Sequence, residues 1–346
     1  MVDTQFDKVF LDFIKKVAPG NALRVVINDL IRAELGALIV FDTPELHKVM
    51  EGGFRVNCRF SAQRLFELCK MDGAVVVSPD LRRILHANVL LTPDNTIHTS
   101  ETGTRHKAAE RTSKQMNTFA LAVSERKKKT TLYHDKSKYV LKNTNELLSD
   151  VSSNLQVLEK QREIFDELTT KLNILEMSNL VSVSDVCKLI QRGEMILKIS
   201  EAIKKYFTEL GTEGNIMNMR YKELLKGVEK AESEVIRDYS MISLKKSRKL
   251  LFNLTFDGLL DLDTIARLVI ERELEENISA KGYRFLSHLN LNEQEVSVLV
   301  DQFKRLDSIF DADIQSLEVN LKARAENIKI EINNLREQIL SGKVVC

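Results

Sequence analysis

The sequence predicts an α/β + α protein, with a mixed-sheet domain first, then a long helical spine and a small helical C-terminal domain. All four prolines, and six of the thirteen glycines, lie before residue 104. In this part, apolar runs of strand length alternate with amphipathic helical segments, which is the pattern of an α/β domain. After it, Leu, Ile, Lys and Glu recur at helical spacing. These shifts predict three domains, at residues 1–142, 143–281 and 282–346.

The first domain should alternate helix and strand along the chain. Asn21 and Ser61 stand where N-caps are favoured, ahead of helices predicted at 22–35 and 62–70. Strands are expected where apolar residues run together, at 36–42, 73–78 and 82–91. A third helix should begin at or near Thr104. Residues 118–141 then predict two strands joined by a charged hairpin, with the lysines at 127–129 solvated at its tip.

The second and third domains should be helical almost throughout. Apolar residues recur at three- and four-residue steps over 147–172, 182–210 and 219–239. Ser182 or Ser184 is expected to cap the second of these helices. Such long, charged helices indicate a spine that spaces domains. From Gly282 onward the pattern predicts short helices followed by a longer one at 325–340.

Bulk composition narrows the class of protein. The formal net charge is +1, so no global basic field favours nucleic acid or an anionic membrane. No apolar stretch reaches the roughly 18 residues that a membrane-spanning helix needs. The four cysteines lack C-x-x-C pairing, which indicates reduced thiols in a cytoplasmic protein and argues against a Cys or His metal centre. The common nucleotide-binding and hydrolase motifs are absent from the sequence.

The segment ETGTRHKAAERTS, residues 101–113, is a candidate anion site. The first N–H groups of a helix have no intrahelical acceptor, and the helix dipole is positive at that end. Thr104 adds a hydroxyl, Arg105 and Lys107 add charge, and His106 can donate or relay a proton. Taken alone, the segment fits a capped surface helix better than an anion site.

Asp72 and Gly73 form the second candidate, between a predicted helix and a predicted strand. A carboxylate at a strand entrance can hold a divalent metal or polarise a hydroxyl. Taken alone, the pair fits a plain Asp-Gly turn better than such a site. Together with the candidate anion site at 101–113 (here called the anion cradle), however, such a carboxylate meets the minimum requirement for phosphoryl or nucleotidyl transfer.

At these residues the chain resembles a known family. MDGA at 71–74 and GTRHK at 103–107 are similar to the DGA and RHR motifs of the diadenylate cyclases, whose catalytic domain is called DAC. The flanking FSAQRLFELCKMDGAVVVS and ANVLLTPD fit that domain as well. The helical middle and a C-terminal unit that begins GYRFLS resemble the DNA integrity scanning members of the family, DisA. The resemblance thus covers nearly the whole chain.

The resemblance implies condensation of two ATP molecules into cyclic di-AMP, with release of two pyrophosphates, between two DAC domains that meet face to face. It implies that Asp72 binds Mg²⁺ or Mn²⁺ and that Gly73 lets the nucleotide approach. Leu91 would line the adenine pocket. The nucleotide phosphates would be held at the helix start by Thr104, Arg105, His106, Lys107 and Ala108. It also implies a homo-octamer and regulation by branched DNA.

Two departures from the family pattern leave alternatives open. The RHR motif reads Arg105-His106-Lys107, and lysine keeps the charge but lacks the bidentate fork of arginine. The C-terminal helix-hairpin-helix of the family uses glycines where this chain has Val319-Asn320-Leu321, and residues 281–346 carry nine Lys or Arg against ten Asp or Glu. Side chains there should keep DNA phosphates from the backbone, and the net charge does not favour DNA. A non-catalytic DAC-fold scaffold or DNA-structure sensor, and a transferase for another nucleotide, remain the alternatives.

Overall fold

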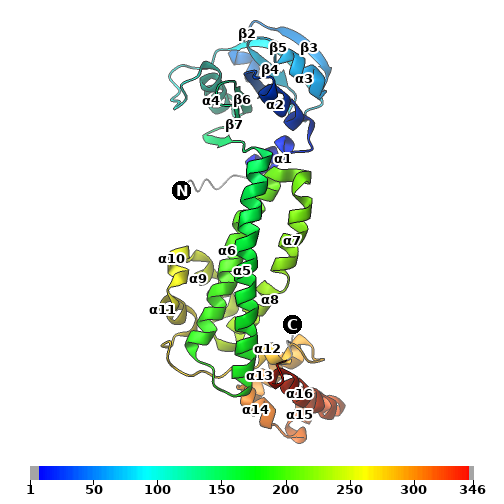
Figure 1. Ribbon diagram of the computed structural model, residues 1–346, viewed down its shortest axis with the longest axis vertical. Coiled ribbons are helices and arrows are strands. Elements are labelled where there is room, and N and C mark those ends of the chain that lie inside the picture. Colours follow the sequence, from blue (N-terminus) through cyan, green and yellow to red (C-terminus); the bar gives the residue numbers. More distant parts are fainter. Residues whose placement is uncertain (1–7, 343–346) are drawn as a thin grey trace. The chain divides into compact units, whose positions relative to one another are not determined.

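The computed structural model describes residues 8–342, so residues 1–7 and 343–346 of the first and last predicted domains lie outside it. The chain divides into two compact units (Figure 1). The first unit contains the residues up to 151 together with 204–218, and the second contains 152–203 together with the residues from 219 onward. Among the described helices, none has both the length and the apolar character needed to cross a bilayer. The three predicted domain ranges stay predictions.

A mixed sheet forms the centre of the first unit, as predicted. Its strands pair in the order β2-β5-β4-β1-β6-β7-β8, and β3 also pairs with β5. β1 and β4 are parallel, with Leu38 opposite Ala74, and the other pairs are antiparallel. The strands are β1 (Ala37–Phe41), β2 (Met50–Glu51), β3 (Phe54–Arg59), β4 (Ala74–Val77), β5 (Arg83–Leu91), β6 (Phe119–Ser124), β7 (Lys129–His134) and β8 (Ser137–Val140).

Helices cover both faces of this sheet. α1 (Lys8–Val17), α2 (Ala22–Arg32) and α3 (Ala62–Leu68) pack against one face, which β1 reaches through Ile39 and Phe41. α4 (Thr104–Met116) packs against the other face, which β1 reaches through Leu38 and Val40. Because side chains alternate along a strand, one buried strand supplies both cores. The continuous apolar run of β1 in the sequence has this origin.

Local capping follows the prediction in one helix and departs from it in another. Ser61 caps α3 through its hydroxyl, which accepts from the Arg64 N–H at 3.3 Å. Asn21 occupies the N-cap position of α2, but its side-chain amide donates to the carbonyls of Lys15 and Ala18. Asn21 therefore fixes the turn between α1 and α2 instead of satisfying the start of α2.

The prediction of two strands within residues 118–141 is wrong, because three strands form there. β6 and β7 make the expected hairpin, and a second, tight turn leads from β7 into β8, where His134 pairs with Ser137. Asp135 starts that turn with a φ of +47°. Aspartate tolerates this left-handed conformation better than most residues, so the turn fits between two short strands.

Long helices form the core of the second predicted domain, and α5 and α6 each contribute to both units. Ser182 caps α6: its hydroxyl accepts from the Asp185 N–H at 3.2 Å and donates to the Asp185 carboxylate at 2.7 Å. The segment predicted as one helix at 219–239 is two helices, which break at Gly227 with a φ of +81°. The helices are α5 (Thr144–Met177), α6 (Val183–Leu210), α7 (Asn215–Leu225), α8 (Val228–Tyr239), α9 (Leu244–Asn253), α10 (Phe256–Leu260) and α11 (Leu262–Ile265).

The C-terminal part of the second unit consists of four short helices and one longer helix, as predicted. They are α12 (Tyr283–Leu286), α13 (Glu293–Phe303), α14 (Leu306–Asp311), α15 (Ile314–Leu321) and α16 (Ala325–Leu340). Buried Asp238 of α8 anchors them, because its carboxylate accepts from the backbone N–H groups of Gly282, Tyr283 and Arg284 at 2.6–3.0 Å. Arg284, also buried, forms an ion pair with Glu176 of α5 at 2.6 Å.

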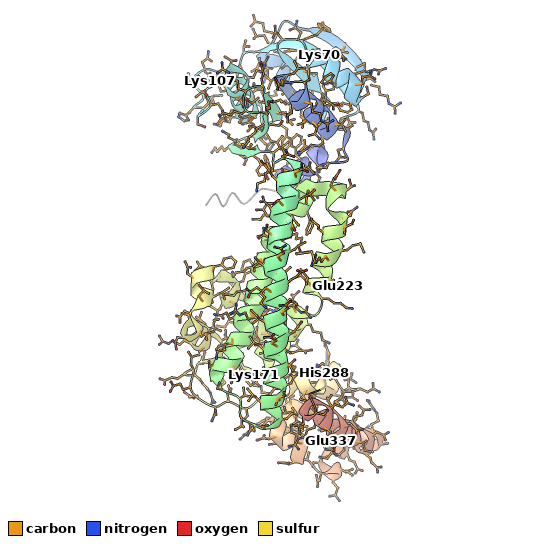
Figure 2. All side chains as sticks on the ribbon, in the orientation of Figure 1. Lys70, Lys107, Lys171, Glu223, His288 and Glu337 are labelled. Atoms are coloured by element: carbon orange, nitrogen blue, oxygen red, sulfur yellow. The ribbon has the colours of Figure 1, made fainter. Side chains whose placement is uncertain are left out.

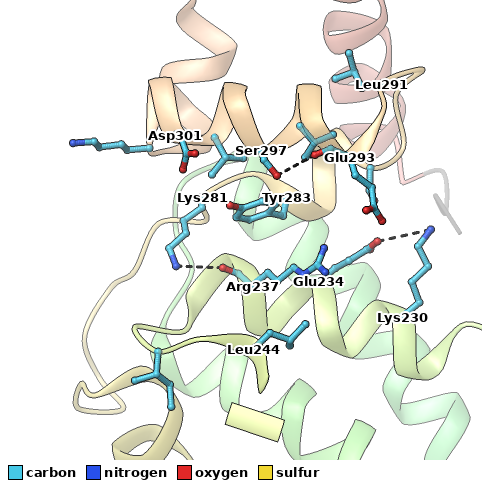
Figure 3. Close-up of a pocket in the computed structure, with 15 residues that line it drawn as sticks. Lys230, Glu234, Arg237, Leu244, Lys281, Tyr283, Leu291, Glu293, Ser297 and Asp301 are labelled. Carbon is cyan, nitrogen blue, oxygen red and sulfur yellow. Dashed lines mark hydrogen bonds and ion pairs between the residues drawn. The ribbon is translucent and has the colours of Figure 1, made fainter. Parts of the chain in front are cut away.

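A hollow of about 860 Å³ lies between α8 and the α12–α13 segment (Figure 3). Its charges are mixed: Lys230 pairs with Glu234 at 3.8 Å, and the Lys281 ammonium donates to the Arg237 carbonyl at 3.2 Å. At the position of the predicted C-terminal hairpin, Val319 projects from α15 with 73% of its surface exposed. A side chain therefore stands where such a hairpin would carry glycine.

Candidate active site

The start of α4 is an open helix end. Gly103 occupies the N-cap position, and no side chain of the described residues caps the helix there. The first intrahelical bond runs from the Lys107 N–H to the Gly103 carbonyl at 2.9 Å. The N–H groups of Thr104, Arg105 and His106 therefore precede the helical hydrogen-bond ladder, and their partial charge is free to meet an anion. The surface helix that the segment alone favoured does form, but without the predicted N-terminal side-chain cap among the described residues.

The second half of α4 holds the loop that leads into this helix start. The Arg111 guanidinium donates to the Ile97 carbonyl at 3.0 Å and to the Asn95 side chain and carbonyl at 2.8 and 2.9 Å. Lys114 donates to the His98 carbonyl at 2.9 Å and pairs with the largely buried Glu110 at 2.7 Å. These charges look like ordinary surface residues in the sequence. In the structure they fix the approach of the chain to Gly103.

Arg105 folds back over the beginning of β1. A Cβ placed on Gly36, the residue before this strand, would overlap the Arg105 Nη1 atom and lie 3.1 Å from its Cζ. The Val123 carbonyl lies 3.5 Å from the same point. The missing side chain at Gly36 therefore provides the space that the Arg105 guanidinium occupies.

Asp72 lies at the same edge of the sheet as Gly36. β1 and β4 run parallel with Leu38 opposite Ala74, so both Gly36 and Asp72 stand two residues before a matched pair. Residues at the starts of adjacent parallel strands come close in space. The fold thus brings Asp72 and Arg105, which are 33 positions apart in the sequence, to one edge. Asp72 is exposed there.

Gly73 has the backbone role that the Asp-Gly turn predicts. Its φ is +82°, and a Cβ at this position would come within 2.7 Å of the Val89 carbonyl oxygen of β5. Both the left-handed backbone and the close approach of two strands require glycine here. The Asp-Gly turn and the candidate site therefore coincide, and Gly73 sets where Asp72 emerges.

His106 is half-buried beside Tyr133 of β7. The two rings meet edge-on, with centroids 6.4 Å apart and an interplanar angle of 82°. Burial lowers the pKa of His106, the negative charge of Glu101 opposes this, and the positive charges of Lys138, Lys127 and Arg105 lower it further. His106 is therefore neutral at pH 7 and offers a hydrogen bond or a proton-relay site instead of a fixed charge.

Three residues at this site had no role assigned from the sequence: Glu101, which begins the candidate segment, Tyr133 and Lys138. The Tyr133 hydroxyl donates to Glu101 at 2.8 Å, and Lys138 forms an ion pair with the same carboxylate. Burial would raise the pKa of Glu101, but the hydrogen bonds from Lys138 and Tyr133 lower it on balance, so Glu101 is ionised. No local signal marks this group, because β7 and β8 contribute two of its members from a distant part of the chain.

The remaining predicted residues differ in burial. Lys107 is partly buried on the first turn of α4 (Figure 2). Leu91 ends β5 with 7% of its surface exposed, and Ala108 packs against the same core, beneath α4. Their assignments to phosphate and adenine binding stay predictions.

Asp72 alone suits a metal ion whose other ligands come from the phosphate groups of a bound substrate. Within residues 8–342, no three His, Cys, Asp or Glu side chains gather closely enough to hold a metal ion. Mg²⁺ is commonly bound through one or two carboxylates, with phosphate oxygens and waters completing its shell. One exposed carboxylate beside an anion cradle suits that arrangement.

Comparison with known proteins gives the family. Residues 25–138 match the DAC model, described as "DisA bacterial checkpoint controller nucleotide-binding", and 141–275 match the model of the "DisA bacterial checkpoint controller linker region". The DNA integrity scanning protein DisA of Symbiobacterium thermophilum is 38% identical over 315 residues, which cover 89% of this chain and 90% of that protein. Its namesake in Clostridium kluyveri is 38% identical over 344 residues, covering 96% and 97%. DacA from Staphylococcus aureus, a solved structure, is 23% identical with a TM-score of 0.32, over 40% of this chain and 92% of that one.

The mixed sheet and its open helix start thus form a nucleotide-binding domain of the DAC class, that of the diadenylate cyclases. With the linker match and the full-length relatives, the chain belongs to the DisA family.

Proposed function

We propose that this protein condenses two ATP molecules into cyclic di-AMP, with release of two pyrophosphates, where two DAC domains meet face to face. The observation that carries the proposal is the convergence of Asp72 with the open start of α4 at one edge of the sheet. A carboxylate for the hydroxyl and an anion cradle for the phosphates are the two groups that nucleotidyl transfer needs. The nucleotide-binding family match supports the assignment of ATP as substrate.

The start of α4 and Asp72 have different roles in this reaction. The N–H groups at Thr104, Arg105 and His106, with the Arg105 and Lys107 cations, bind the triphosphate and stabilise charge on the departing pyrophosphate. Each 3′-oxygen forms a bond to the α-phosphorus of the facing ATP as the bond to pyrophosphate breaks. The hydroxyl proton passes to Asp72 or to water. Asp72 would also hold Mg²⁺ or Mn²⁺ with the phosphate oxygens, and the ion would make the hydroxyl more acidic.

One DAC domain supplies half of this reaction. Asp72, Gly73 and Thr104 are exposed in the single chain, so a second domain has access to the bound ATP. The homo-oligomer, an octamer by the resemblance, is therefore part of the proposed mechanism. Each ATP needs a partner on the opposite domain.

The test is an assay of the full-length protein with ATP and either Mg²⁺ or Mn²⁺, with products separated by chromatography. We expect cyclic di-AMP from the wild type and none from Asp72→Asn. Asp135→Asn is the matched control, because Asp135 is an exposed carboxylate of the same domain in the β7–β8 turn. Equal product from Asp72→Asn and the control would contradict the role of Asp72, and no product from the wild type with either metal would contradict the cyclase assignment.

Binding of branched DNA is a separate question, and the DAC-fold scaffold or DNA-structure sensor remains the alternative function. The balanced charge of the C-terminal region and the exposed Val319 weigh against DNA contact there. A gel-shift titration with branched and linear DNA, run beside the cyclase assay, separates the cases. A branched-DNA shift without cyclic di-AMP would favour the sensor. If branched DNA produces no shift and does not change the cyclase rate, DNA has no part in the proposed function.

A further inference from the structure

A cationic hollow lies on the opposite side of the sheet from α4. We call it the α2 pocket; its volume is about 420 Å³. α2, β7 and the start of α5 line it, and α2 packs on the sheet face that α4 does not cover. The α2 pocket is therefore separate from the proposed ATP site. Its charged lining residues are Arg24, Arg32, Lys128, Lys129, Lys142 and Glu146.

Arg24 is the central feature of the α2 pocket. Only 4% of its surface is exposed, and one guanidinium nitrogen, Nη2, donates to the Lys142 carbonyl at 2.8 Å. Its Nε and Nη1 atoms are buried and find no acceptor among the described residues. Burial lowers the pKa of Arg24, and the charge of Glu209 opposes that effect without a hydrogen bond to the guanidinium. Buried donors without acceptors are rare, and each calls for a partner.

Thr130 provides an independent second observation. Its side chain lines the α2 pocket with 1% of its surface exposed, and its hydroxyl oxygen also has no partner among the described residues. Thr130 lies on β7, far in sequence from Arg24 on α2. Two elements thus each bring an unsatisfied polar group to the same hollow. A core that merely tolerated one buried arginine would not need both.

The rest of the lining favours an anion over a cation or a neutral ligand. The 34-residue helix α5 begins at Thr144 on the pocket wall, but its first turn is already engaged: the Asn143 side chain accepts from the Asn145 N–H at 3.2 Å, and the Glu146 carboxylate accepts from the Asn143 N–H at 3.3 Å. An anion is therefore favoured by the side-chain cations and the hydroxyl of the lining. Several rim cations are already paired: Lys128 with Glu34 at 2.7 Å, Lys142 with Asp150 at 2.6 Å, and Arg32 with Asp29 at 3.8 Å. Lys129 is exposed at the rim, so Arg24 and Lys129 are the cations left to meet a ligand.

We propose that the α2 pocket binds the phosphate group of a small ligand, with Arg24 and Thr130 at its base and Lys129 at its rim. A phosphate oxygen accepts several hydrogen bonds at once, which matches two guanidinium nitrogens and a hydroxyl that have no partner among the described residues in the lining of one hollow. The sequence treats the lysines at 127–129 as a solvated hairpin tip. The structure gives Lys129 a position beside a built site instead.

The experiment measures binding to the full-length protein by isothermal titration calorimetry at constant ionic strength. The probes are inorganic phosphate, pyrophosphate and AMP, without ATP or metal. The Arg105→Ala background weakens the proposed ATP site, and substitutions in the pocket then assign any remaining binding to the α2 pocket whether or not the cyclase assignment holds. We expect binding to persist in that background with a dissociation constant on the order of 1 mM or below.

Substitutions then locate the bound anion. In the Arg105→Ala background, Lys129→Met should weaken binding about threefold, as expected for one exposed charge. Arg24→Met should weaken it by about tenfold or more, because it removes a buried donor. Thr130→Val deletes only an unpartnered hydroxyl, so it tests the base of the α2 pocket without a large risk to folding. Lys136→Met is the control, since Lys136 is exposed in the β7–β8 turn outside the pocket.

The relative affinities for AMP and inorganic phosphate identify the source of the bound phosphate group. Tighter binding of AMP than of phosphate identifies a nucleotide as the source, and equal affinity identifies a free phosphate; either result sustains the site. Absence of binding in the Arg105→Ala background overturns the proposal. So does binding that Lys129→Met and Thr130→Val leave equal to the Lys136→Met control, because the anion then sits elsewhere.

Discussion

Gly36→Ala tests the link between the sheet edge and Arg105 without touching a charged residue. The new Cβ would overlap Arg105 Nη1 and lie 3.1 Å from its Cζ, whereas the Val123 carbonyl at 3.5 Å is an ordinary contact. Only the end of a flexible side chain has to move. Gly36 also lacks the left-handed φ that would strain alanine. The fold should therefore accept the change, and the guanidinium should not keep its position.

The expected effects on stability and on rate have opposite signs. Replacing glycine by alanine where the backbone allows it stabilises a protein by about 0.4–1 kcal/mol, through the unfolded state. Displacing a preorganised cation from a developing negative charge costs on the order of 10²-fold in kcat, or about 3 kcal/mol. Gly36→Ala should thus melt at the same temperature as the wild type or slightly above it, and form cyclic di-AMP about 100 times more slowly.

Two controls decide the reading of that result. Gly258→Ala makes the same substitution in α10, where the new Cβ would meet only ordinary contacts at 3.4 Å or more, and it should leave the rate unchanged. Arg105→Ala combined with Gly36→Ala should be no slower than Arg105→Ala alone, because both changes remove the same interaction. Full activity of Gly36→Ala, or fully additive losses in the double variant, would refute the argument. So would a lower melting temperature.

Three further changes test other parts of the chain. Lys107→Arg should lower the KM for ATP about twofold to fivefold through a bidentate phosphate contact, and an unchanged KM would show that residue 107 does not reach the phosphates. Asp238→Ala should destabilise the second unit by about 3–5 kcal/mol in denaturant titrations, because three backbone N–H groups, two of them buried, lose their acceptor, while Asp238→Asn should cost less. Glu232 is fully buried, and neither carboxylate oxygen has a hydrogen-bond partner within residues 8–342; burial, then the nearby Glu194, raises its pKa. Its protonated form therefore favours folding below the unfolded-state pKa, and that contribution is lost as pH rises, so Glu232→Gln should raise the melting temperature at pH 8 but not at pH 4.

Regular patterns in the sequence predict most of the first domain. The apolar runs and capping residues give β1, β4, β5, α2, α3 and α4 within a few residues of their ends. Two missed elements also carry signals. FRVNCR at 54–59 alternates apolar and polar residues as an edge strand does, and Phe10, Phe13, Ile14 and Val17 recur at helical spacing in α1. β2 has two residues, and no local pattern of that length specifies a strand.

The candidate site is only half visible in the sequence. Asp72 and the segment 103–107 can be recognised because each is a short local motif. The contact of Arg105 with Gly36, and that of Tyr133 with Glu101, depend on strand order and register. A one-residue slip between paired strands would move each side chain to the other face. Such contacts are fixed by the whole sheet, so no window of sequence contains them.

Small side chains explain how α4 reaches its place above the sheet. Ala109 on the buried face of α4 packs in the same core as Ala74 of β4 and Ala120 and Ala122 of β6. Alanines on both sides let the helix backbone approach the strands closely, as larger side chains would not. The helix start is then close enough for Arg105 to reach Gly36 and for His106 to meet Tyr133. These alanines look like ordinary helix and strand residues in the sequence. They determine how closely the start of α4 packs on the sheet, and so how far the anion cradle lies from the sheet edge that carries Asp72.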